Sequence, residues 1–403
     1  MRFELGILSL QFLIRTLEPL ELGISTDYQT NSDKQNSIKA LVMRLTSITN
    51  LRLYNQHITQ SRFVEPDEIV RWIGAVQAQD YLGSLWGIGL RLKSSNESEI
   101  EKAIESRKIV RSWPMRGTLH FVASEDLRWM LKFLTPRVIQ RCAGLYKQAG
   151  LDNKVFAKSS KLLSAALRTE QRLTRKDIYA VWERARIPTG GQRGLHILGH
   201  LAQTGLICFG ARKGKQQTFV LLDEWLPSSK MLQKDQAFAK LTLTYFQSHG
   251  PARIQDFSWW SGLTIAEATQ AVRSLGSQLV AEKLDEQTHY ILPETQQQKT
   301  SQHVFLLPSY DEYFVAYKNR NAAFNSKIIK NIKQLGNGIF TSPIVINGLM
   351  AGYWKRSFMK DKVLIETNVV SSISKSASDA MEAAARRFGK FLKMPIEVSQ
   401  NHG

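Results

Sequence analysis

The sequence is poor in the residues that staple a fold together or bind metal. Only two of its 403 residues are cysteines, Cys142 and Cys208, which excludes a disulfide framework and a cysteine-rich zinc site and is typical of a reducing compartment. No apolar run reaches the roughly 18 residues that a membrane-spanning helix needs. The apolar N-terminus contains Glu4 and Arg15 and has no small-residue cleavage site, unlike a secretory signal peptide. We therefore expect a cytoplasmic protein.

Common catalytic motifs are missing as well. The chain has no G-x-x-x-x-G-K-[ST] phosphate loop, no H-E-x-x-H helix and no G-x-S-x-G elbow. His196 and His200 have the spacing of two metal ligands on a helix, but no acidic residue or cysteine close in sequence supplies a third ligand. Asp311 and Glu312 lack the clustered carboxylates of a metal nuclease, and we expect them to cap a helix or pair with a local Arg or Lys. We expect no metal and no other cofactor.

Positive charge, in contrast, is abundant. The chain contains 54 Lys and Arg against 35 Asp and Glu, which gives a formal net charge of +19 and an isoelectric point near 9.8. The first 43 residues contain four basic and five acidic residues, a net charge of −1, so the remaining 360 residues carry +20. A charge of this size favours a polyanionic partner, either nucleic acid or an anionic membrane surface.

The patterning divides the chain into several parts. Residues 1–42 end in a polar stretch with weak periodicity and predict an extension or linker that is poorly ordered. Residues 43–155 begin with helical patterns, among them "EPDEIVRWIGAV", in which Pro66 and the acids suit a helix N-terminus. A strand-like segment, "TLHFV", follows these helices. The combination predicts a first winged helix-turn-helix unit.

Residues 156–230 show the clearest pattern. Three helical segments precede a hairpin, "LICFGARKGKQQTFVLL", whose tip is rich in Gly and Lys. Three helices with a basic hairpin predict a winged helix, in which the third helix usually lies on DNA and the wing touches phosphate. Residues 231–297 repeat the order of three helices and a hairpin and predict a third unit. The candidate DNA contacts of the second unit are Arg193, Arg212, Lys213 and Lys215.

The last hundred residues change character. After a polar linker at 295–302, residues 303–403 contain strand-like runs separated by turns and end in a helix, which predicts a small β-barrel or curled sheet. The predicted fold class is therefore α+β, with tandem winged helix-turn-helix units followed by a small C-terminal β-barrel. A basic stretch without acids forms either a solvated loop or a phosphate-binding one; it contains Lys318, Arg320, Lys327, Lys330 and Lys333.

Two glutamines flank a single alanine in the segment "GAVQAQDY". Side chains two residues apart leave an extended backbone on the same face, whereas on a helix they diverge by roughly 200°. If this segment is extended, the carboxamides of Gln77 and Gln79 act as a pair. Otherwise they form a polar patch on an exposed turn.

Four segments resemble, in their order and rough spacing, the AlkZ-like bacterial DNA glycosylases. They are "IVRWIGAVQAQDYLGSLWGIGLRL", "WPMRGTLHFV", "HGPARIQDFSWWSGL" and "LLPSYDEYFVAYKNR". The resemblance covers about residues 44–395 and includes the signature of that family, which is Gln77-Ala78-Gln79 in this chain. It implies tandem winged helices followed by a β-barrel. It also implies removal of alkylated bases from DNA and, in the founding branch of the family, unhooking of interstrand crosslinks.

The residue types suit this implied activity. A purine alkylated at N7 or N3 already carries positive charge, so it leaves C1′ without protonation by a general acid. A carboxamide is no effective base near pH 7, but its oxygen accepts a hydrogen bond from water while its NH₂ group orients other groups. With Gln77 and Gln79 as the catalytic pair, we expect a preference for cationic lesions over uracil, and hydrolysis without strand cleavage because no lysine is singled out as a Schiff-base nucleophile. We expect the neighbouring Asp80 to be structural.

Two hypotheses follow from the sequence. The first is a monofunctional DNA glycosylase of the bacterial cytoplasm and nucleoid, which acts on double-stranded DNA with alkylated or crosslinked purines and needs no membrane or obligate protein partner. A crosslinked base cannot swing out freely, so the enzyme needs a broad DNA surface, which Arg116 and His120 in "MRGTLHFV" are candidates to line. The second is a non-catalytic winged-helix DNA-binding protein or transcription regulator, which needs the same basic wings but has no use for the glutamine pair.

Overall fold

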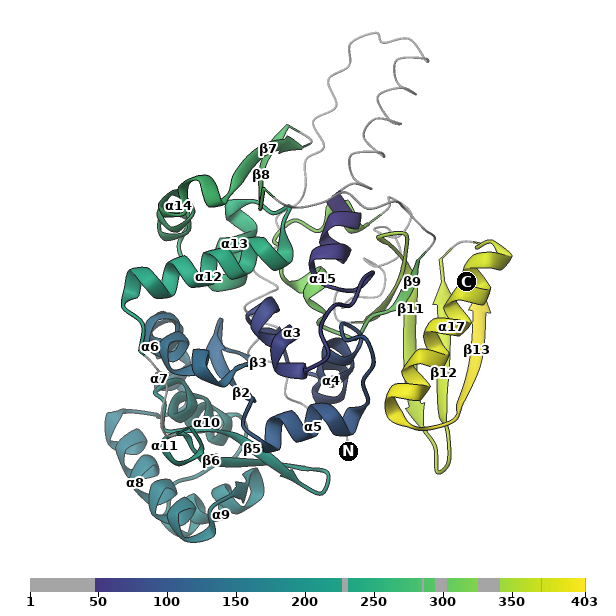
Figure 1. Cartoon of the computed structure of the whole chain (residues 1–403). Coiled ribbons are helices and arrows are strands. Elements are labelled where there is room, and N and C mark those ends of the chain that lie inside the picture. Colours follow the sequence, from purple (N-terminus) through teal and green to yellow (C-terminus); the bar gives the residue numbers. More distant parts are fainter. Residues whose placement is uncertain are drawn as a thin grey trace.

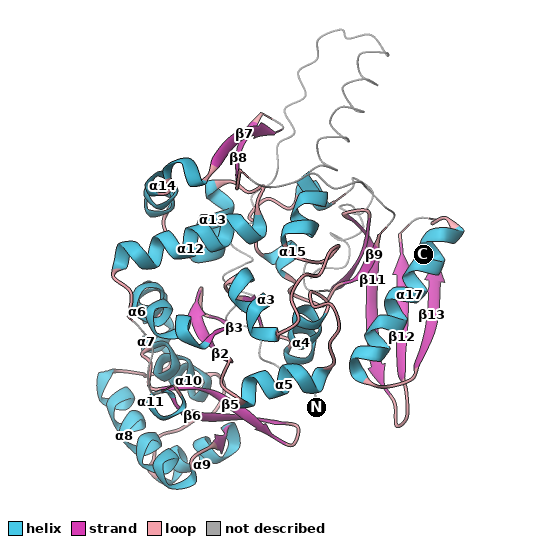
Figure 2. Ribbon diagram, viewed as in Figure 1, coloured by secondary structure: helices cyan, strands magenta, loops and turns pink. Residues whose placement is uncertain are grey.

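The computed structural model describes residues 48–226, 231–284, 286–293, 303–324, 341–370 and 372–402. The extension at 1–42, the linker at 295–302 and the lysines Lys327, Lys330 and Lys333 lie outside the described residues. Helices and small antiparallel sheets alternate along the chain, and a larger sheet forms its C-terminal part (Figures 1 and 2). The predicted α+β class is confirmed.

The first part of the chain builds a three-stranded sheet behind a group of helices. Residues 48–55 are helical. The elements that follow are α3 (Pro66–Ile73), β1 (Val76–Gln77), α4 (Tyr81–Gly89), α5 (Glu97–Glu105), β2 (Ile109–Met115) and β3 (Thr118–Ala123). The helix α3 starts at Pro66 with two acids in its first turn, as the sequence predicts. The strands lie in the order β1-β3-β2, so β1 is an edge strand.

The second part repeats this strand order. It is reached through α6 (Ser124–Arg141) and α7 (Ala143–Gln148) and contains α8 (Asn153–Glu170), β4 (Leu173–Thr174), α9 (Arg175–Arg184), α10 (Arg193–Gln203), β5 (Ile207–Lys213), β6 (Gln216–Leu221) and α11 (Leu222–Trp225). Its sheet has the order β4-β6-β5, in which the first strand again pairs with the third. This succession agrees with the recurrence expected from the sequence, while the division into winged-helix units stays a prediction.

The third part is smaller. It contains α12 (Lys234–His249), α13 (Ile254–Ser261), α14 (Ile265–Ser274), the short helix η1 (Gly276–Gln278) and the hairpin of β7 (Val280–Leu284) and β8 (Gln287–Ile291). The order of three helices followed by a hairpin matches the predicted order.

The C-terminal part is a curved five-stranded sheet covered by one long helix (Figure 1). Its elements are β9 (Val304–Leu306), α15 (Glu312–Val315), η2 (Asn321–Ala323), β10 (Ser342–Ile346), β11 (Leu349–Phe358), β12 (Val363–Val369), α17 (Lys375–Leu392) and β13 (Ile396–His402). The strand order is β13-β12-β11-β10-β9, with only the β12–β13 pair parallel. Within the described residues β9 and β13 are free edges, so the sheet is a half-barrel, which agrees with the curled sheet that the sequence predicts as the alternative to a small barrel.

Two hydrophobic cores meet at β1. One core joins the first two parts to the C-terminal sheet, and Trp86 of α4 connects them by packing on Phe388 and donating a hydrogen bond to the Leu306 carbonyl oxygen at 2.8 Å. The other core joins β2, β3 and α6 to the helices of the third part. Ala75 belongs to the second core and Val76 to the first. The segment that carries the two glutamines therefore begins where the cores meet.

Candidate active site

The segment Gln77-Ala78-Gln79, called the amide segment below, leaves α3 through a tight turn and runs along the edge of β3. Gly74 makes this turn with φ +86°, and a Cβ atom there would lie 2.8 Å from Thr244 Cγ2. Gln77 lies opposite His120 in the antiparallel ladder, and the Ala78 N–H donates to the Leu119 carbonyl oxygen at 2.7 Å. The start of the segment is therefore extended, the condition under which the sequence predicts that the two amides act together.

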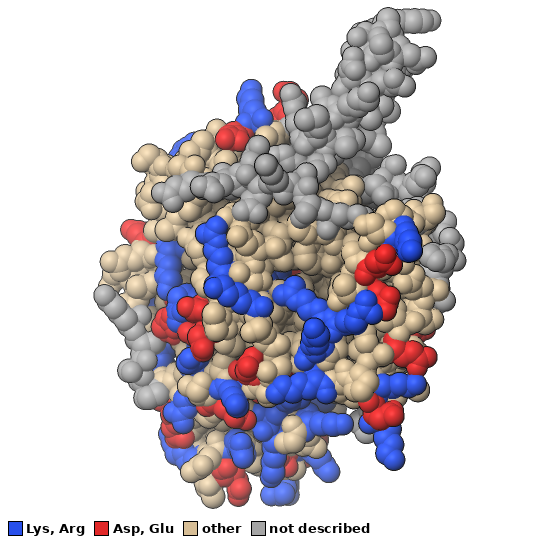
Figure 3. Space-filling view, turned by 45° about the vertical axis from the view of Figure 1, so that its right-hand side comes forward, with Lys and Arg blue, Asp and Glu red and all other residues tan. Residues whose placement is uncertain are grey.

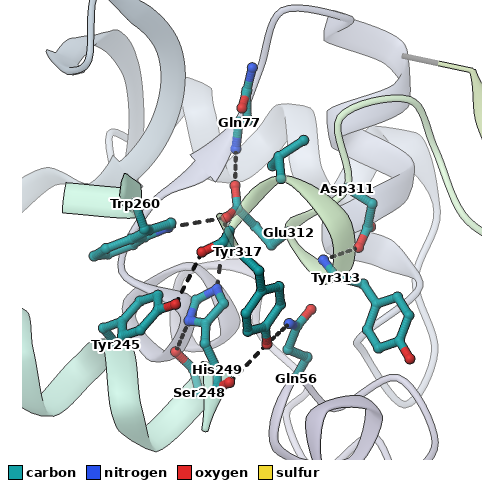
Figure 4. A network of polar contacts seen from close by, with 12 residues as sticks. Gln56, Gln77, Tyr245, Ser248, His249, Trp260, Asp311, Glu312, Tyr313 and Tyr317 are labelled. Atoms are coloured by element: carbon teal, nitrogen blue, oxygen red, sulfur yellow. Dashed lines mark hydrogen bonds and ion pairs between the residues drawn. The ribbon is translucent and has the colours of Figure 1, made fainter. Parts of the chain in front are cut away.

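The two carboxamides differ in their hydrogen bonds. Gln79 Oε1 accepts the backbone N–H of Leu119 at 2.8 Å, so this side chain continues the ladder and keeps its NH₂ group for other partners. The Gln77 side chain is 8% exposed, and its carboxamide forms no hydrogen bond within the described part of the chain. It points away from the polar network behind the strand (Figure 4). Gln77 is thus the open amide and Gln79 the fixed one.

A buried arginine holds the middle of the amide segment. Arg111 of β2 donates to the Ala78 carbonyl oxygen from Nε at 3.2 Å and from Nη2 at 2.7 Å. Its guanidinium lies over the ring of Phe209, 4.6 Å from the ring centroid, and it makes no ion pair with any carboxylate of the described residues. Burial lowers the pKa of Arg111 to about 10. Arg111 also donates to Gln217 Oε1 at 3.2 Å, so its desolvation is offset by hydrogen bonds to neutral acceptors and not by an ion pair.

His120 and Arg116, both predicted to line the DNA surface, lie beside Gln77. His120 is the cross-strand partner of Gln77, and directly opposite side chains leave the same face of a sheet. His120 Nε2 accepts Arg116 Nη2 at 2.8 Å, and its Nδ1 lies 2.9 Å from the Thr118 carbonyl oxygen, to which it donates. Burial and the Arg116 charge lower the pKa of His120 well below its ordinary value. The imidazole next to Gln77 is therefore neutral.

A second predicted arginine shares this neighbourhood. Arg320 donates from Nε to the Phe314 carbonyl oxygen at 2.6 Å and lies over the Trp259 ring at 5.8 Å. Burial and the nearby Arg116 charge lower the pKa of Arg320 to about 10. Lys318, two residues earlier, is exposed. The structure brings these three cations to one side of the molecule.

The four basic residues predicted on the second unit fall into two groups. Arg193 donates to three backbone carbonyl oxygens, and Arg212 pairs with Glu97 at 3.1 Å and Glu101 at 2.5 Å, so both guanidinium groups have internal partners. Lys213 and Lys215, at the tip of the β5–β6 hairpin, are exposed. In the space-filling view, Lys and Arg side chains gather over the centre and lower half of the molecule (Figure 3). DNA contact by these residues stays a prediction.

Asp80 has the structural role expected for it. Its carboxylate accepts the Gly83 N–H at 3.1 Å at the start of α4 and pairs with Arg356 of β11 at 2.7 Å. This pair joins the end of the amide segment to the C-terminal sheet. Because both interactions occupy the carboxylate, it is not free to act as a base on the open side of the strand.

The histidine pair on α10 packs against aromatic rings. His200 stacks on Phe156 with ring centroids 3.7 Å apart, and His196 makes an edge contact with Tyr146. Across the described residues, no group of three or more His, Cys, Asp or Glu side chains is arranged to hold a metal ion. The helices of these residues also include none that is long and apolar enough to cross a membrane.

The two adjacent acids of the segment "LLPSYDEYFVAYKNR", Asp311 and Glu312, have different partners. Asp311 accepts both terminal nitrogens of Arg91, at 2.7 and 2.9 Å, and caps α15 through the Tyr313 N–H. The expected cap is confirmed, whereas the expected pairing with a local Arg or Lys is wrong, because Arg91 is 220 residues away in sequence. Glu312 has neither an Arg nor a Lys partner among the described residues. It accepts the Gln77 backbone N–H at 2.8 Å (Figure 4).

Sequence reasoning missed Arg111, and it assigned Glu312 a cap or a local ion pair in place of its contact with the amide segment. Arg111 is a single charge within "IVRSW", and Glu312 follows Asp311 at the start of the apolar run "YFVAY". A charge in a buried stretch is rare unless it is paired, so this pattern was the signal that could have identified both of them.

Comparison with known proteins places the chain among DNA glycosylases. A family model described as DNA glycosylase AlkZ-like matches residues 70–391. Because this match spans most of the sequence, the chain belongs to the AlkZ-like DNA glycosylase family, as the four segments indicate.

Two relatives support this assignment. The interstrand DNA cross-link repair glycosylase of Streptomyces sahachiroi is 20% identical over 328 residues, which cover 73% of this chain and 85% of the relative. The solved structure of Streptomyces sahachiroi DNA glycosylase AlkZ superposes with a TM-score of 0.72 at 16% identity and covers 89% of this chain and 99% of that one. The similarity of fold therefore extends over almost the whole of both chains.

Proposed function

We propose that this chain is a monofunctional DNA glycosylase that hydrolyses the N-glycosidic bond of cationic N-alkylated purines in double-stranded DNA. Gln77 and Gln79 are its catalytic residues. One observation carries the proposal: the Gln77 carboxamide makes no hydrogen bond to any residue that the structure describes, while the backbone and side chains around it are held by buried partners. A free polar group on a fixed strand is available to bind a substrate or a water molecule.

The proposed reaction uses the charge of the lesion. A cationic purine departs with the electrons of the C1′–N bond and becomes neutral, so no acid has to protonate it. Gln77 Oε1 accepts a hydrogen bond from a water molecule beneath C1′, and the free NH₂ group of Gln79 donates to the same water or to the sugar. The water attacks C1′ as the base leaves, and its proton passes to solvent.

The surroundings of Gln77 support this division of labour. His120 cannot serve as the base, because Nδ1 holds its proton against Thr118 and Nε2 accepts the Arg116 guanidinium. The charged groups that contact the amide segment are Arg111 and Glu312, and neither is an amine that could form a Schiff base. Both facts favour simple hydrolysis of a base that is already charged.

Exposed cations supply the proposed DNA contacts. Lys213, Lys215 and Lys318 are free to neutralise phosphates, while Arg116 and Arg320 lie closer to the amide segment. The name of the Streptomyces relative refers to interstrand cross-link repair. We propose that this chain also releases crosslinked purines, because the two S. sahachiroi matches and the Gln-x-Gln segment point the same way.

A single-turnover excision assay tests the proposal. Enzyme in excess is mixed with a duplex that carries one N7-methylguanine, and alkali converts each abasic site to a strand break. We expect excision by the wild type, no break before alkali, and little release from a uracil duplex. Gln77→Ala and Gln79→Ala should each slow excision by about 100-fold, the size expected for loss of a positioning contact. A second duplex, with a nitrogen-mustard crosslink, tests unhooking.

A matched variant separates the catalytic amides from amides in general. Gln278 is an exposed glutamine of η1 in the third part of the chain. Gln278→Ala should excise at the wild-type rate. If the wild type releases neither N7-methylguanine nor a crosslinked base, the enzymatic proposal is wrong. If Gln77→Ala excises as fast as the wild type, the activity stands but Gln77 is not its catalytic residue.

A further inference from the structure

The backbone N–H of Gln77 faces away from its sheet. The Val76–Gln77 strand pairs only with β3, and Gln77 and His120 form a pair whose ladder hydrogen bonds run through the flanking residues, such as Ala78 N–H to Leu119 O. The Gln77 N–H is therefore left without a strand partner. A buried N–H without a hydrogen-bond acceptor destabilises the fold, so a group outside the sheet has to accept the Gln77 N–H.

Glu312 supplies that partner from another part of the chain. Its Oε1 accepts the Gln77 N–H at 2.8 Å, and its Oε2 accepts the Trp260 indole N–H at 3.1 Å (Figure 4). The side chain is 1% exposed. Its only acid–base neighbour within 4.0 Å in the described structure is His249, whose Nε2 lies 3.7 Å from Oε2 and whose pKa is lowered by burial. The carboxylate is thus held by neutral N–H donors and not by a salt bridge to Lys or Arg.

The residues that flank Glu312 hold its carboxylate in place. Asp311, the preceding residue, is bound to Arg91, and the Tyr313 hydroxyl donates to the Gly348 carbonyl oxygen at 2.7 Å. One turn further on, the Tyr317 hydroxyl donates to the His249 carbonyl oxygen at 2.8 Å. The short helix α15 therefore has little freedom to shift, and neither does the oxygen that holds the Gln77 N–H.

We propose that Glu312 is a positioning residue of the glycosylase reaction, a role that rests on the proposed function of Gln77. It acts through the backbone: Oε1 fixes the strand, and the strand aims the Gln77 carboxamide. Folding alone gives little reason to bury a carboxylate among neutral donors, because apolar residues would fill the same space without the desolvation cost. A hydrogen bond that sets the place of a water-binding amide gives such a reason.

A glutamine at this position cannot replace the carboxylate. Gln77 N–H and Trp260 Nε1–H are both donors and face two different oxygens. A carboxamide has one acceptor oxygen, so its NH₂ group would face one of the two donors. Glu312→Gln should therefore lose one hydrogen bond with little change in volume. Removing the indole donor with Trp260→Phe leaves the amide oxygen free to accept the Gln77 N–H, so the double variant should recover the contact.

The test compares single-turnover excision of N7-methylguanine, DNA affinity and melting temperature for these variants. Glu312→Gln should excise about 100-fold more slowly while binding the lesion duplex with the wild-type dissociation constant. Trp260→Phe should stay close to the wild-type rate, and Glu312→Gln/Trp260→Phe should regain at least tenfold over Glu312→Gln. Glu267→Gln is the matched control, because Glu267 also accepts a backbone N–H, that of Thr264 at 2.9 Å, but in α14. It should excise normally.

Three outcomes overturn the proposal: a wild-type rate for Glu312→Gln, a double variant as slow as Glu312→Gln when both are folded, or a rate loss that follows the melting temperature and disappears on cooling. If the double variant does not fold, a measurement on the single variant Glu312→Gln still tests the contact. The amide proton of Gln77 in a transverse-relaxation-optimised NMR spectrum should move upfield in Glu312→Gln, and no movement overturns the contact. Failure of the wild type to excise refutes the proposed function instead.

Discussion

The pair of Arg91 and Asp311 offers a sharp test of the scaffold behind the site. The two side chains are 3% and 1% exposed, and two parallel hydrogen bonds of 2.7 and 2.9 Å join them. Arg91 also donates to the Gly87 carbonyl oxygen and to Gln56 Oε1. Asp311→Asn keeps the shape of the side chain but removes the negative charge, and its NH₂ group then faces a guanidinium N–H.

The expected cost is large. Unit charges about 4 Å apart attract by about 4 kcal/mol at an effective dielectric constant near 20. Breaking one partner of a buried pair costs about 3–5 kcal/mol, because the remaining charge stays buried without compensation. We expect Asp311→Asn to lower the free energy of unfolding by an amount in this range. The pair also lies one residue before Glu312, so the excision rate should fall with it.

Urea denaturation followed by tryptophan fluorescence measures the effect. The control is Glu397→Gln, which removes a carboxylate that is 56% exposed and pairs with Lys362 on the surface, where the expected cost is about 0–1 kcal/mol. The double variant Arg91→Met/Asp311→Leu should recover most of the lost stability, because apolar residues of similar volume often replace a buried pair without loss. A cost for Asp311→Asn as small as that for Glu397→Gln would refute the reasoning.

Three further predictions concern the turn, the pH dependence and the wing. Gly74→Ala would place an alanine at φ +86° with its Cβ atom 2.8 Å from a neighbouring side chain, and it should lower the free energy of unfolding by about 1–3 kcal/mol. The control Gly190→Ala, whose Cβ would meet no atom within 4 Å, should leave the melting temperature unchanged. Burial lowers the pKa of His249 below its ordinary value near 6.5, so below pH 6.5 the unfolded chain binds a proton at this residue that the folded chain does not. This histidine alone should lower the free energy of unfolding by up to about 1.4 kcal/mol per pH unit. Because the pKa of His120 is lowered as well, His249→Gln should reduce the slope in urea titrations between pH 7.5 and 5.5 without abolishing it. Replacing Lys213 and Lys215 by Ala should weaken binding of any duplex and reduce the slope of log affinity against log salt by about one per lysine, and an unchanged slope would show that the wing does not touch phosphate.

Local patterns of the sequence were sufficient to predict helices and strands, but not which of them contact one another in the fold. The helix at Pro66 and the hairpin tip at Lys213 follow from propensity and periodicity, which act over a few residues, whereas the extended state of the amide segment was left open. The sequence could not decide between a small barrel and a curled sheet, because strand-like runs do not say whether the edge strands meet. The structural role predicted for Asp80 agrees with its contacts to Gly83 and Arg356, but the sequence did not predict either partner.

The charged residues of the site show where local patterns fail. Glu312 and Gln77 are 235 residues apart, and Arg111 and Ala78 are 33 apart. Periodicity says which face of an element is buried, but it cannot say which backbone group a buried charge will meet. For the same reason, composition could not show that Arg212 forms ion pairs with two glutamates while Lys215 is exposed.

If the proposed catalytic role of the Gln77 amide is correct, the rate depends on the geometry of the site and not on the acidity of a catalytic group. A general base gains rate from its pKa, whereas a carboxamide gains it only by holding a water molecule in the right place. The amide segment meets this demand with partners from three elements: α15 holds its first N–H, β3 its second N–H and the Gln79 oxygen, and β2 its middle carbonyl. Two of these partners, Arg111 and Glu312, are buried charges of opposite sign without ion-pair partners of their own among the Lys, Arg, Asp and Glu residues that the structure describes. Their desolvation lowers stability, and precise placement of Gln77 for its proposed catalytic role explains why both charges are present at one strand.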